Sequence, residues 1–189
     1  MRFYGAIGSP GSAEVMGDLG VAPICLSTFP DKLLSRILER WRARAGAAAK
    51  DAILPISVKM FIADSDEEAR QLGRRYYPPY FDLQCSHYES DADPWADIPE
   101  YQDFSRMFAN LRKLTDPAEL GPFMDSNLVG SPATICRRID QLAALGFNYF
   151  MVSSATPGTP IELRQRMMTR FAREVCPRYS RAMRTTQAA

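Results

Sequence analysis

Two predicted helices in this sequence begin with glycine, serine and proline, and these residue types suit the binding of a phosphate. Gly8-Ser9-Pro10-Gly11-Ser12 follows the first predicted strand, and a second Gly-Ser-Pro occupies residues 130–132. Small residues let an anion approach the backbone, hydroxyls donate hydrogen bonds to it, and free N–H groups at the helix end attract it. The first copy therefore indicates a phosphorylated cofactor. The alternative is that Ser9 only caps its helix, which is the role we expect for Ser131.

The two Gly-Ser-Pro segments share one sequence plan. Each runs from a strand through a helix ending in Leu-Gly to a second strand, over residues 2–27 and 127–154. Serine is placed to cap each helix and proline to occupy its first position. Gly20 or Gly146 then ends the helix, because glycine enters the left-handed conformation freely. A strand, a helix and another strand form the βαβ unit of a parallel sheet, so the repeat predicts an α/β fold.

The rest of the chain is predicted to extend this plan around one irregular insertion. Helix 31–45 has an apolar stripe, and Asp64 or Ser65 caps a short acidic helix over 65–75. Regular patterning then ends, so we expect an insertion at about 76–125 with one helix near 101–114. Its aromatic residues either line an apolar pocket or pack as core. The predicted strands are 2–7, 21–27, 54–63 and 147–153, and the other helices are 10–19, 132–145 and 160–175, the last ending at Cys176-Pro177.

Composition excludes several classes of protein. The 189 residues carry 23 basic and 22 acidic side chains, a net charge of +1, so no overall field favours nucleic acid or an anionic membrane. The four cysteines lack metal-ligand spacing, and the acidic residues between 91 and 97 do not match a calcium loop, so no metal is predicted. There is no signal peptide and no apolar run approaching about 18 residues, so we expect a cytoplasmic protein.

Four segments of the chain are together specific enough to indicate a family. They read GAIGSPGSAEVMGDLGVAPICLS, VKMFIADSDEEARQL, LVGSPATICRRIDQLAALGFNYFMV and RFAREVCPRY. In this order they resemble the C-terminal half of the bacterial luciferase-like monooxygenases. The resemblance implies a partial (β/α)₈ TIM barrel holding about the last four βα units. It implies one domain over 1–180, with the insertion at 76–125, and a frayed tail at 181–189.

The resemblance also implies an activity. The expected protein is a flavin-dependent oxidoreductase, a monooxygenase that uses O2 and reduced FMN from a separate reductase to oxygenate an apolar small molecule. The deazaflavin F420 is the less favoured cofactor. The family's N-terminal half has no counterpart here, so we expect a fragment or a half-barrel that forms a homodimer or joins a chain supplying that half. The alternative is a non-catalytic flavin-binding or interaction module, or an inactive fragment.

Specific cofactor-binding residues follow from the resemblance. The Ser9 and Ser12 hydroxyls, with the backbone from Gly8 through Gly11 to Ser12, would bind the FMN phosphate. Ser27 and Thr28 come just after the second strand, where a (β/α)₈ barrel holds its chemistry, and would face the flavin. The alternative for these two is an ordinary turn before the next helix.

Other polar residues are weaker candidates. Ser153 and Ser154 follow the last strand, in the place that corresponds to Ser27 and Thr28. His87 is the only histidine, but it falls in the insertion, and the family's catalytic histidine belongs to the half without a counterpart here. We therefore expect His87 to lie in an exposed loop, and we predict no catalytic residue and no nucleophile–base triad.

Overall fold

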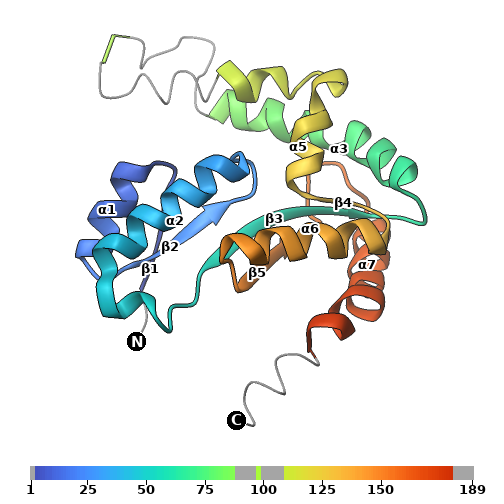
Figure 1. The fold of residues 1–189 in the computed structure, drawn as a ribbon. Coiled ribbons are helices and arrows are strands. Elements are labelled where there is room, and N and C mark those ends of the chain that lie inside the picture. The colour runs from blue at the N-terminus through green and yellow to red at the C-terminus, as the bar shows by residue number, and fades with distance from the viewer. Residues whose placement is uncertain (1–2, 88–96, 99–108, 181–189) are drawn as a thin grey trace. The chain divides into compact units, whose positions relative to one another are not determined.

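The computed structural model describes residues 3–87, 97–98 and 109–180. Figure 1 shows the helices and strands found there. The strands are β1 (Tyr4–Ala6), β2 (Ala22–Leu26), β3 (Pro55–Ile62), β4 (Leu128–Gly130) and β5 (Tyr149–Ser153). The helices are α1 (Pro10–Asp18), α2 (Asp31–Ala45), α3 (Asp66–His87), α5 (Gly121–Ser126), α6 (Pro132–Leu145) and α7 (Ile161–Arg170). Short 3₁₀ helices occupy Gly46–Ala49 and Pro117–Leu120, and a π-helical turn occupies Phe171–Val175.

The chain divides into two compact units. Unit 1 comprises residues 1–60, 126–128 and 133–153, and unit 2 comprises residues 61–125, 129–132 and 154–189. The predicted tail at 181–189 lies outside the described residues, and so does most of the predicted helix 101–114, of which 109–113 are helical.

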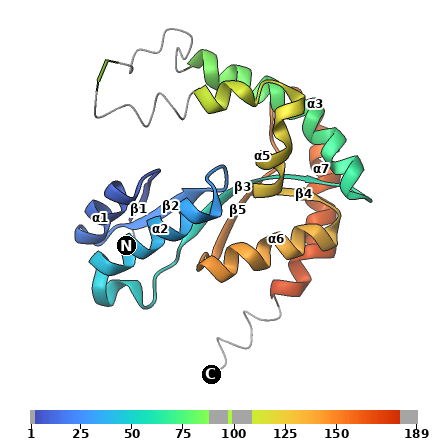
Figure 2. The ribbon, with the colours of Figure 1, turned by 45° about the horizontal axis from the view of Figure 1, so that its top comes forward.

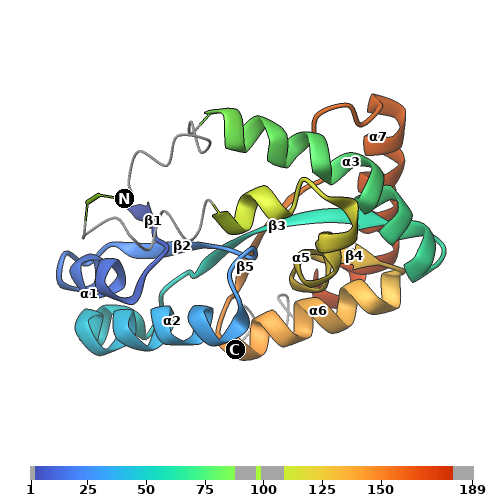
Figure 3. The ribbon, with the colours of Figure 1, turned by 90° about the horizontal axis from the view of Figure 1, so that it is seen from above.

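Unit 1 is built on a parallel sheet. β1 pairs with β2, β2 with β3, and β3 with β5, all in parallel. The helices α2 and α6 lie on one side of this sheet, as Figures 1 and 3 show. Parallel strands joined by helices are the arrangement that the Gly-Ser-Pro repeat predicts, and the α/β class is confirmed.

The two faces of β3 differ in burial. Ile56, Val58 and Met60 are at most 1% exposed, whereas Ser57 and Lys59 between them are only half-buried. Because successive side chains of a strand point to opposite faces, the first three belong to the covered face of the sheet. We call the other face the Lys59 face. Through strand pairing it also carries Leu26 of β2 and the β5 residues Met151 and Ser153.

Local hydrogen bonds set the ends of the helices as predicted. The Ser9 hydroxyl oxygen accepts a 3.2 Å bond from the Ser12 N–H, which caps α1, and Pro10 holds the first helical position. Gly20 and Gly146 have φ values of +68° and +113°, so both follow their helices in a conformation that favours glycine.

A partly buried ion pair joins α2 and α6. Arg138 of α6 donates bonds of 2.8 and 2.7 Å to the two carboxylate oxygens of Asp31 at the start of α2. The Arg138 side chain is 8% exposed, and it also donates to the Ser126 carbonyl. The guanidinium holds the pKa of the Asp31 carboxyl below its usual range. A bidentate pair of this kind fixes the orientation of both helices as well as their separation.

The acidic helix, which belongs to unit 2, is longer than predicted. Instead of ending near residue 75, α3 runs for 22 residues to His87, through Pro78 and Pro79. Phe61 contacts Tyr76 and Tyr77, and Phe123 of α5 contacts Tyr77 and Phe81, all as ring pairs. Figure 2 shows α5 against α3. The prolines remove backbone donors, but burial of aromatic side chains on the same stretch stabilises the helix.

The last helix also continues further than predicted. Residues 176–180 remain helical beyond the π-helical turn, so Pro177 does not end the helix. Its buried apolar residues include Met167 and Val175, whereas Ile161 and Met168 are 61% and 40% exposed. Among the described residues, no helix combines the length and apolarity needed to cross a membrane.

Candidate functional site

The N-terminus of α1 presents two hydroxyls to solvent. The Ser9 and Ser12 hydroxyl oxygens lie 3.0 Å apart, and Gly8, Gly11 and Ser12 are exposed. The cap uses Ser9 as an acceptor from the Ser12 N–H. The hydroxyl hydrogen of Ser9 can still be donated to a ligand. The backbone N–H of Gly11 has no acceptor within the helix. The structure thus brings Ser9 and Ser12 together, and the capping role of Ser9 is compatible with anion binding.

Gly8 and Gly11, at the start of α1, differ in the space around their Cα atoms. A Cβ at Gly8 would lie 3.1 Å from the Phe29 ring, so packing within unit 1 accounts for this glycine. A Cβ at Gly11 would meet nothing within 4 Å. Gly11 therefore leaves open space directly over the first turn of α1, where a phosphate would approach the backbone.

Ser27 is placed differently from Ser9 and Ser12. It is 1% exposed, and its hydroxyl donates a 2.5 Å bond to the Asn127 side-chain oxygen. The same oxygen accepts the backbone N–H of Lys59 at 2.8 Å. The Asn127 amide thus takes the place of a strand carbonyl at the point where β2 ends beside β3. Because its hydrogen is directed to Asn127, the Ser27 oxygen can interact with a ligand only as an acceptor.

Lys59 is a residue that the sequence reasoning missed. It pairs directly with Ser153, the last residue of β5, so both side chains belong to the Lys59 face. Burial lowers the pKa of the Lys59 ammonium. The sequence does contain a signal that could have identified this residue, because it is the single charged residue of the predicted strand segment LPISVKMFIA. A lysine within a strand is not explained by exposure in a solvated loop.

The remaining candidates differ from one another in burial. Thr28 is exposed, and Ser154 is buried in unit 2. His87 is exposed as predicted, but it is the last residue of α3 and not part of a loop. Burial raises the pKa of the Cys25 thiol to about 12, which makes this cysteine a poor nucleophile. Within the described residues, no three side chains gather that could hold a metal ion.

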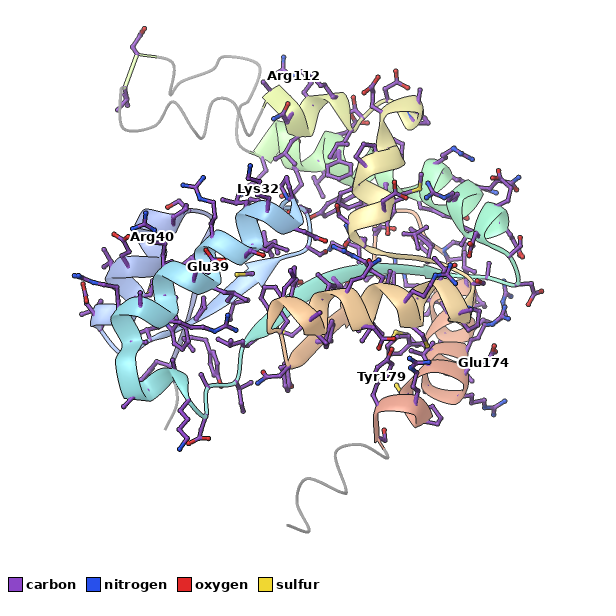
Figure 4. All side chains as sticks on the ribbon, viewed as in Figure 1. Lys32, Glu39, Arg40, Arg112, Glu174 and Tyr179 are labelled. Atoms are coloured by element: carbon purple, nitrogen blue, oxygen red, sulfur yellow. The ribbon has the colours of Figure 1, made fainter. Side chains whose placement is uncertain are left out.

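Unit 2 contains a groove along α7 with a volume of about 570 Å³. Its lining is charged, and Arg170 bonds to Asp64 at 2.6 Å and to Glu174 at 2.9 Å. Figure 4 labels Glu174 on this last helical segment. Apolar pockets are lined mainly by hydrophobic and aromatic side chains, so this groove does not suit an apolar substrate.

Comparisons with known proteins agree with this fold. The sequence model of one family, described as luciferase-like monooxygenase, matches residues 3–149, and the chain belongs to that family. Among solved structures, monooxygenase RslO1 from Streptomyces bottropensis is 25% identical with a TM-score of 0.59. That match covers 94% of this chain and 48% of RslO1. A search of curated proteins finds no match.

Two further solved structures share the fold at lower identity. The FMN complex of the oxygenating constituent of 3,6-diketocamphane monooxygenase from Pseudomonas putida is 22% identical, with a TM-score of 0.55, covering 92% of this chain and 47% of its own. An F420-dependent secondary alcohol dehydrogenase with an F420–acetone adduct is 12% identical, with a TM-score of 0.53, covering 87% and 46%. The chain thus spans about half the length of these proteins. The predicted fold class, a partial (β/α)₈ barrel, is confirmed.

The shared hydrogen bonds of Asn127 lead to a stability prediction. We expect Ser27→Ala to lower the free energy of unfolding by about 1 kcal/mol, and Asn127→Ala by about 2 kcal/mol because two donors lose their acceptor. Since both changes remove the same bond, the double variant should cost about 1 kcal/mol less than the sum. Urea denaturation measures all three, with Ser35→Ala on α2 as the serine control. Strictly additive losses would contradict the shared bond.

Proposed function

We propose that this chain contributes the phosphate-binding half of a flavin-dependent monooxygenase. The observation that carries the proposal is the exposed N-terminus of α1, where the paired hydroxyls of Ser9 and Ser12 stand beside the open space at Gly11. These groups fit a phosphate, because two hydroxyls, a backbone amide and the positive end of a nine-residue helix converge on one point. Family membership supports the flavin as the bearer of that phosphate.

The separate roles of the cofactor and of the chain follow from the chemistry of the flavin. Bound flavin supplies the redox chemistry with O2, which no side chain can perform. The chain's own task is to anchor the phosphate at Ser9 and Ser12 and to offer the Lys59 face to the rest of the site. We propose reduced FMN, delivered by a separate reductase, as the cofactor, and an apolar organic molecule as the substrate. F420 is the second candidate, because its phosphate would bind at the same N-terminus of α1.

We further propose that unit 1 associates with complementary βα units, supplied by another chain or by a second copy. In the described residues β1 pairs with β2 alone, so its second edge has no strand beside it. Phe3, Val15 and Leu19, on or beside β1 and α1, are 66%, 58% and 69% exposed. A bare strand edge next to exposed apolar side chains favours association, and a parallel strand followed by its helix would cover both.

A titration of the purified chain with FMN tests the phosphate site. We expect saturable quenching of flavin fluorescence, and at least about tenfold weaker binding by Ser9→Ala, which loses a hydrogen bond to a charged group. Ser131→Ala, at the same position of the second Gly-Ser-Pro, is the matched control and should bind as the wild type does. Circular dichroism checks that α1 survives the loss of its cap. Equal affinities of wild type and Ser9→Ala would overturn the proposed site.

Sedimentation velocity tests the association. In the absence of another chain we expect the wild type to form a dimer, and the variant Val15→Glu/Leu19→Glu to be monomeric because it places charges on the proposed contact. Ile161→Glu is the control, since Ile161 is equally exposed but belongs to α7 of unit 2. If the wild type is monomeric, the proposed partner of this surface is a different chain and not a second copy. A dimer unaffected by the double variant would exclude the surface altogether.

A further inference from the structure

We propose that the groove along α7 binds a small molecule through a phosphate group. All residues that line this groove belong to unit 2, so the site is separate from the start of α1 and does not rest on the proposed flavin site. Its volume of about 570 Å³ falls within the range of roughly 300–1,000 Å³ that is usual for small-molecule sites. The class of ligand follows from which charged side chains of the groove are already paired.

Arg170 is already bound within the chain. It forms ion pairs with Asp64, which follows β3, at 2.6 Å and with Glu174, one turn further along the helix, at 2.9 Å. The Arg170 side chain is 26% exposed. Because two carboxylates occupy its guanidinium, Arg170 is not available to a ligand.

Arg166 and Arg173 differ from Arg170 in having no acceptor. In the part of the chain that the structure describes, neither guanidinium forms a hydrogen bond or an ion pair, and the Thr169 hydroxyl forms no hydrogen bond. Positions 166, 169 and 173 recur at the spacing of one helix face, and all three side chains line the groove. Two available cations thus lie on either side of an available hydroxyl.

A phosphate group suits these donors better than a carboxylate does. A guanidinium presents its N–H groups as a planar fork, and one fork is enough to bind both oxygens of a carboxylate. A phosphate monoester has three terminal oxygens and up to two negative charges, so it can accept from two guanidiniums and from a hydroxyl between them. Arg166, Thr169 and Arg173 supply this set of donors.

The acidic side chains of the groove limit where the anion binds. The lining contains three acidic and three basic side chains, so its net charge is zero and hydrogen bonds at short range must select the ligand. Glu162 lies one turn before Arg166 and would repel an anion at the start of α7, whereas the other two carboxylates are held by Arg170. We therefore place the phosphate at Thr169, between the two unpaired guanidiniums.

The backbone of this helix supplies a second reason to place a site here. The π-helical turn Phe171–Val175 contains Arg173 and Glu174, and Figure 4 labels Glu174 on it. Single π-helical turns within helices are rare and are frequently found at functional sites. This feature of the backbone is independent of the charges in the groove.

An NMR titration of the isotope-labelled chain with inorganic pyrophosphate tests the site. The backbone amides of α7 report on the groove itself, so binding at the start of α1 does not affect the result. We expect saturable shifts along residues 166–173, and binding at least about tenfold weaker in Arg166→Gln/Arg173→Gln, which loses hydrogen bonds to a charged group. Arg36→Gln/Arg137→Gln is the matched control, because it removes two exposed arginines of unit 1 and gives the same net charge.

Each outcome decides the inference. Saturable shifts that the groove variant loses and the control keeps support it. Equal weakening in both variants would indicate attraction by net charge alone and overturn it, and so would the absence of shifts on α7 in the folded wild type.

Two further comparisons complete the test. Citrate, which has a similar charge but carries only carboxylates, should bind more weakly than pyrophosphate, and equally tight binding of citrate would overturn the choice of phosphate. If circular dichroism shows that the double groove variant does not fold, Arg166→Gln and Arg173→Gln are measured singly and judged by the same criteria.

Discussion

The arrangement of unit 1 depends on the hydrogen bonding of β3 along both of its edges. β2 and β5 pair with this strand from opposite sides, so its side chains can only point to the two faces of the sheet. One face is sealed by Ile56, Val58 and Met60 under the helices. Lys59 is therefore held on the other face, at the level where its neighbours end.

The Asn127 amide completes this arrangement. Where β2 stops, the N–H of Lys59 would lose its strand partner, and a buried donor without an acceptor is costly. Asn127 supplies the acceptor and also takes the Ser27 hydroxyl. The polar groups at this end of the sheet are thus hydrogen-bonded within the chain, whereas Gly11 and Ser12 at the start of α1 are exposed.

The helices on the covered face are placed by specific contacts. Arg138 holds the start of α2 against α6, and the Trp41 indole donates to the Val21 carbonyl at the start of β2. Figure 4 labels Lys32 and Glu39 on α2, and both residues are exposed, as expected for positions outside the apolar stripe of this helix. Contacts across the chain therefore fix a helix whose existence local sequence already determined.

Local signals predicted the elements whose ends depend on neighbouring residues. Ser9, Pro10 and Gly20 mark the limits of α1, because capping and left-handed turns act over a few residues. The course of α3 through Pro78 and Pro79 could not be read this way, because aromatic packing on Phe61 and Phe123 outweighs the local effect of proline. The same holds for Ser27, whose partner Asn127 is 100 residues away in the sequence.

Lys59 shows a different limit of sequence reasoning. Its charge was visible in the sequence, but its position relative to the ends of β2 and β5 depends on strand register. Register is set by pairing between segments nearly a hundred residues apart, and a shift of one residue would move the lysine to the covered face. The proposed phosphate site, by contrast, lies within one turn of α1, so the residues that would form it could be chosen from the sequence alone, and phosphate binding there stays a prediction.

The measurement that tests the central claim most directly compares FMN with riboflavin, which has the same ring but no phosphate. Equilibrium dialysis of the purified chain against each flavin separates the contribution of the phosphate from that of the ring. If the start of α1 binds the phosphate, FMN should bind at least about tenfold more tightly than riboflavin, because charge-assisted hydrogen bonds are lost with the phosphate. Equal affinities for the two flavins would contradict the account.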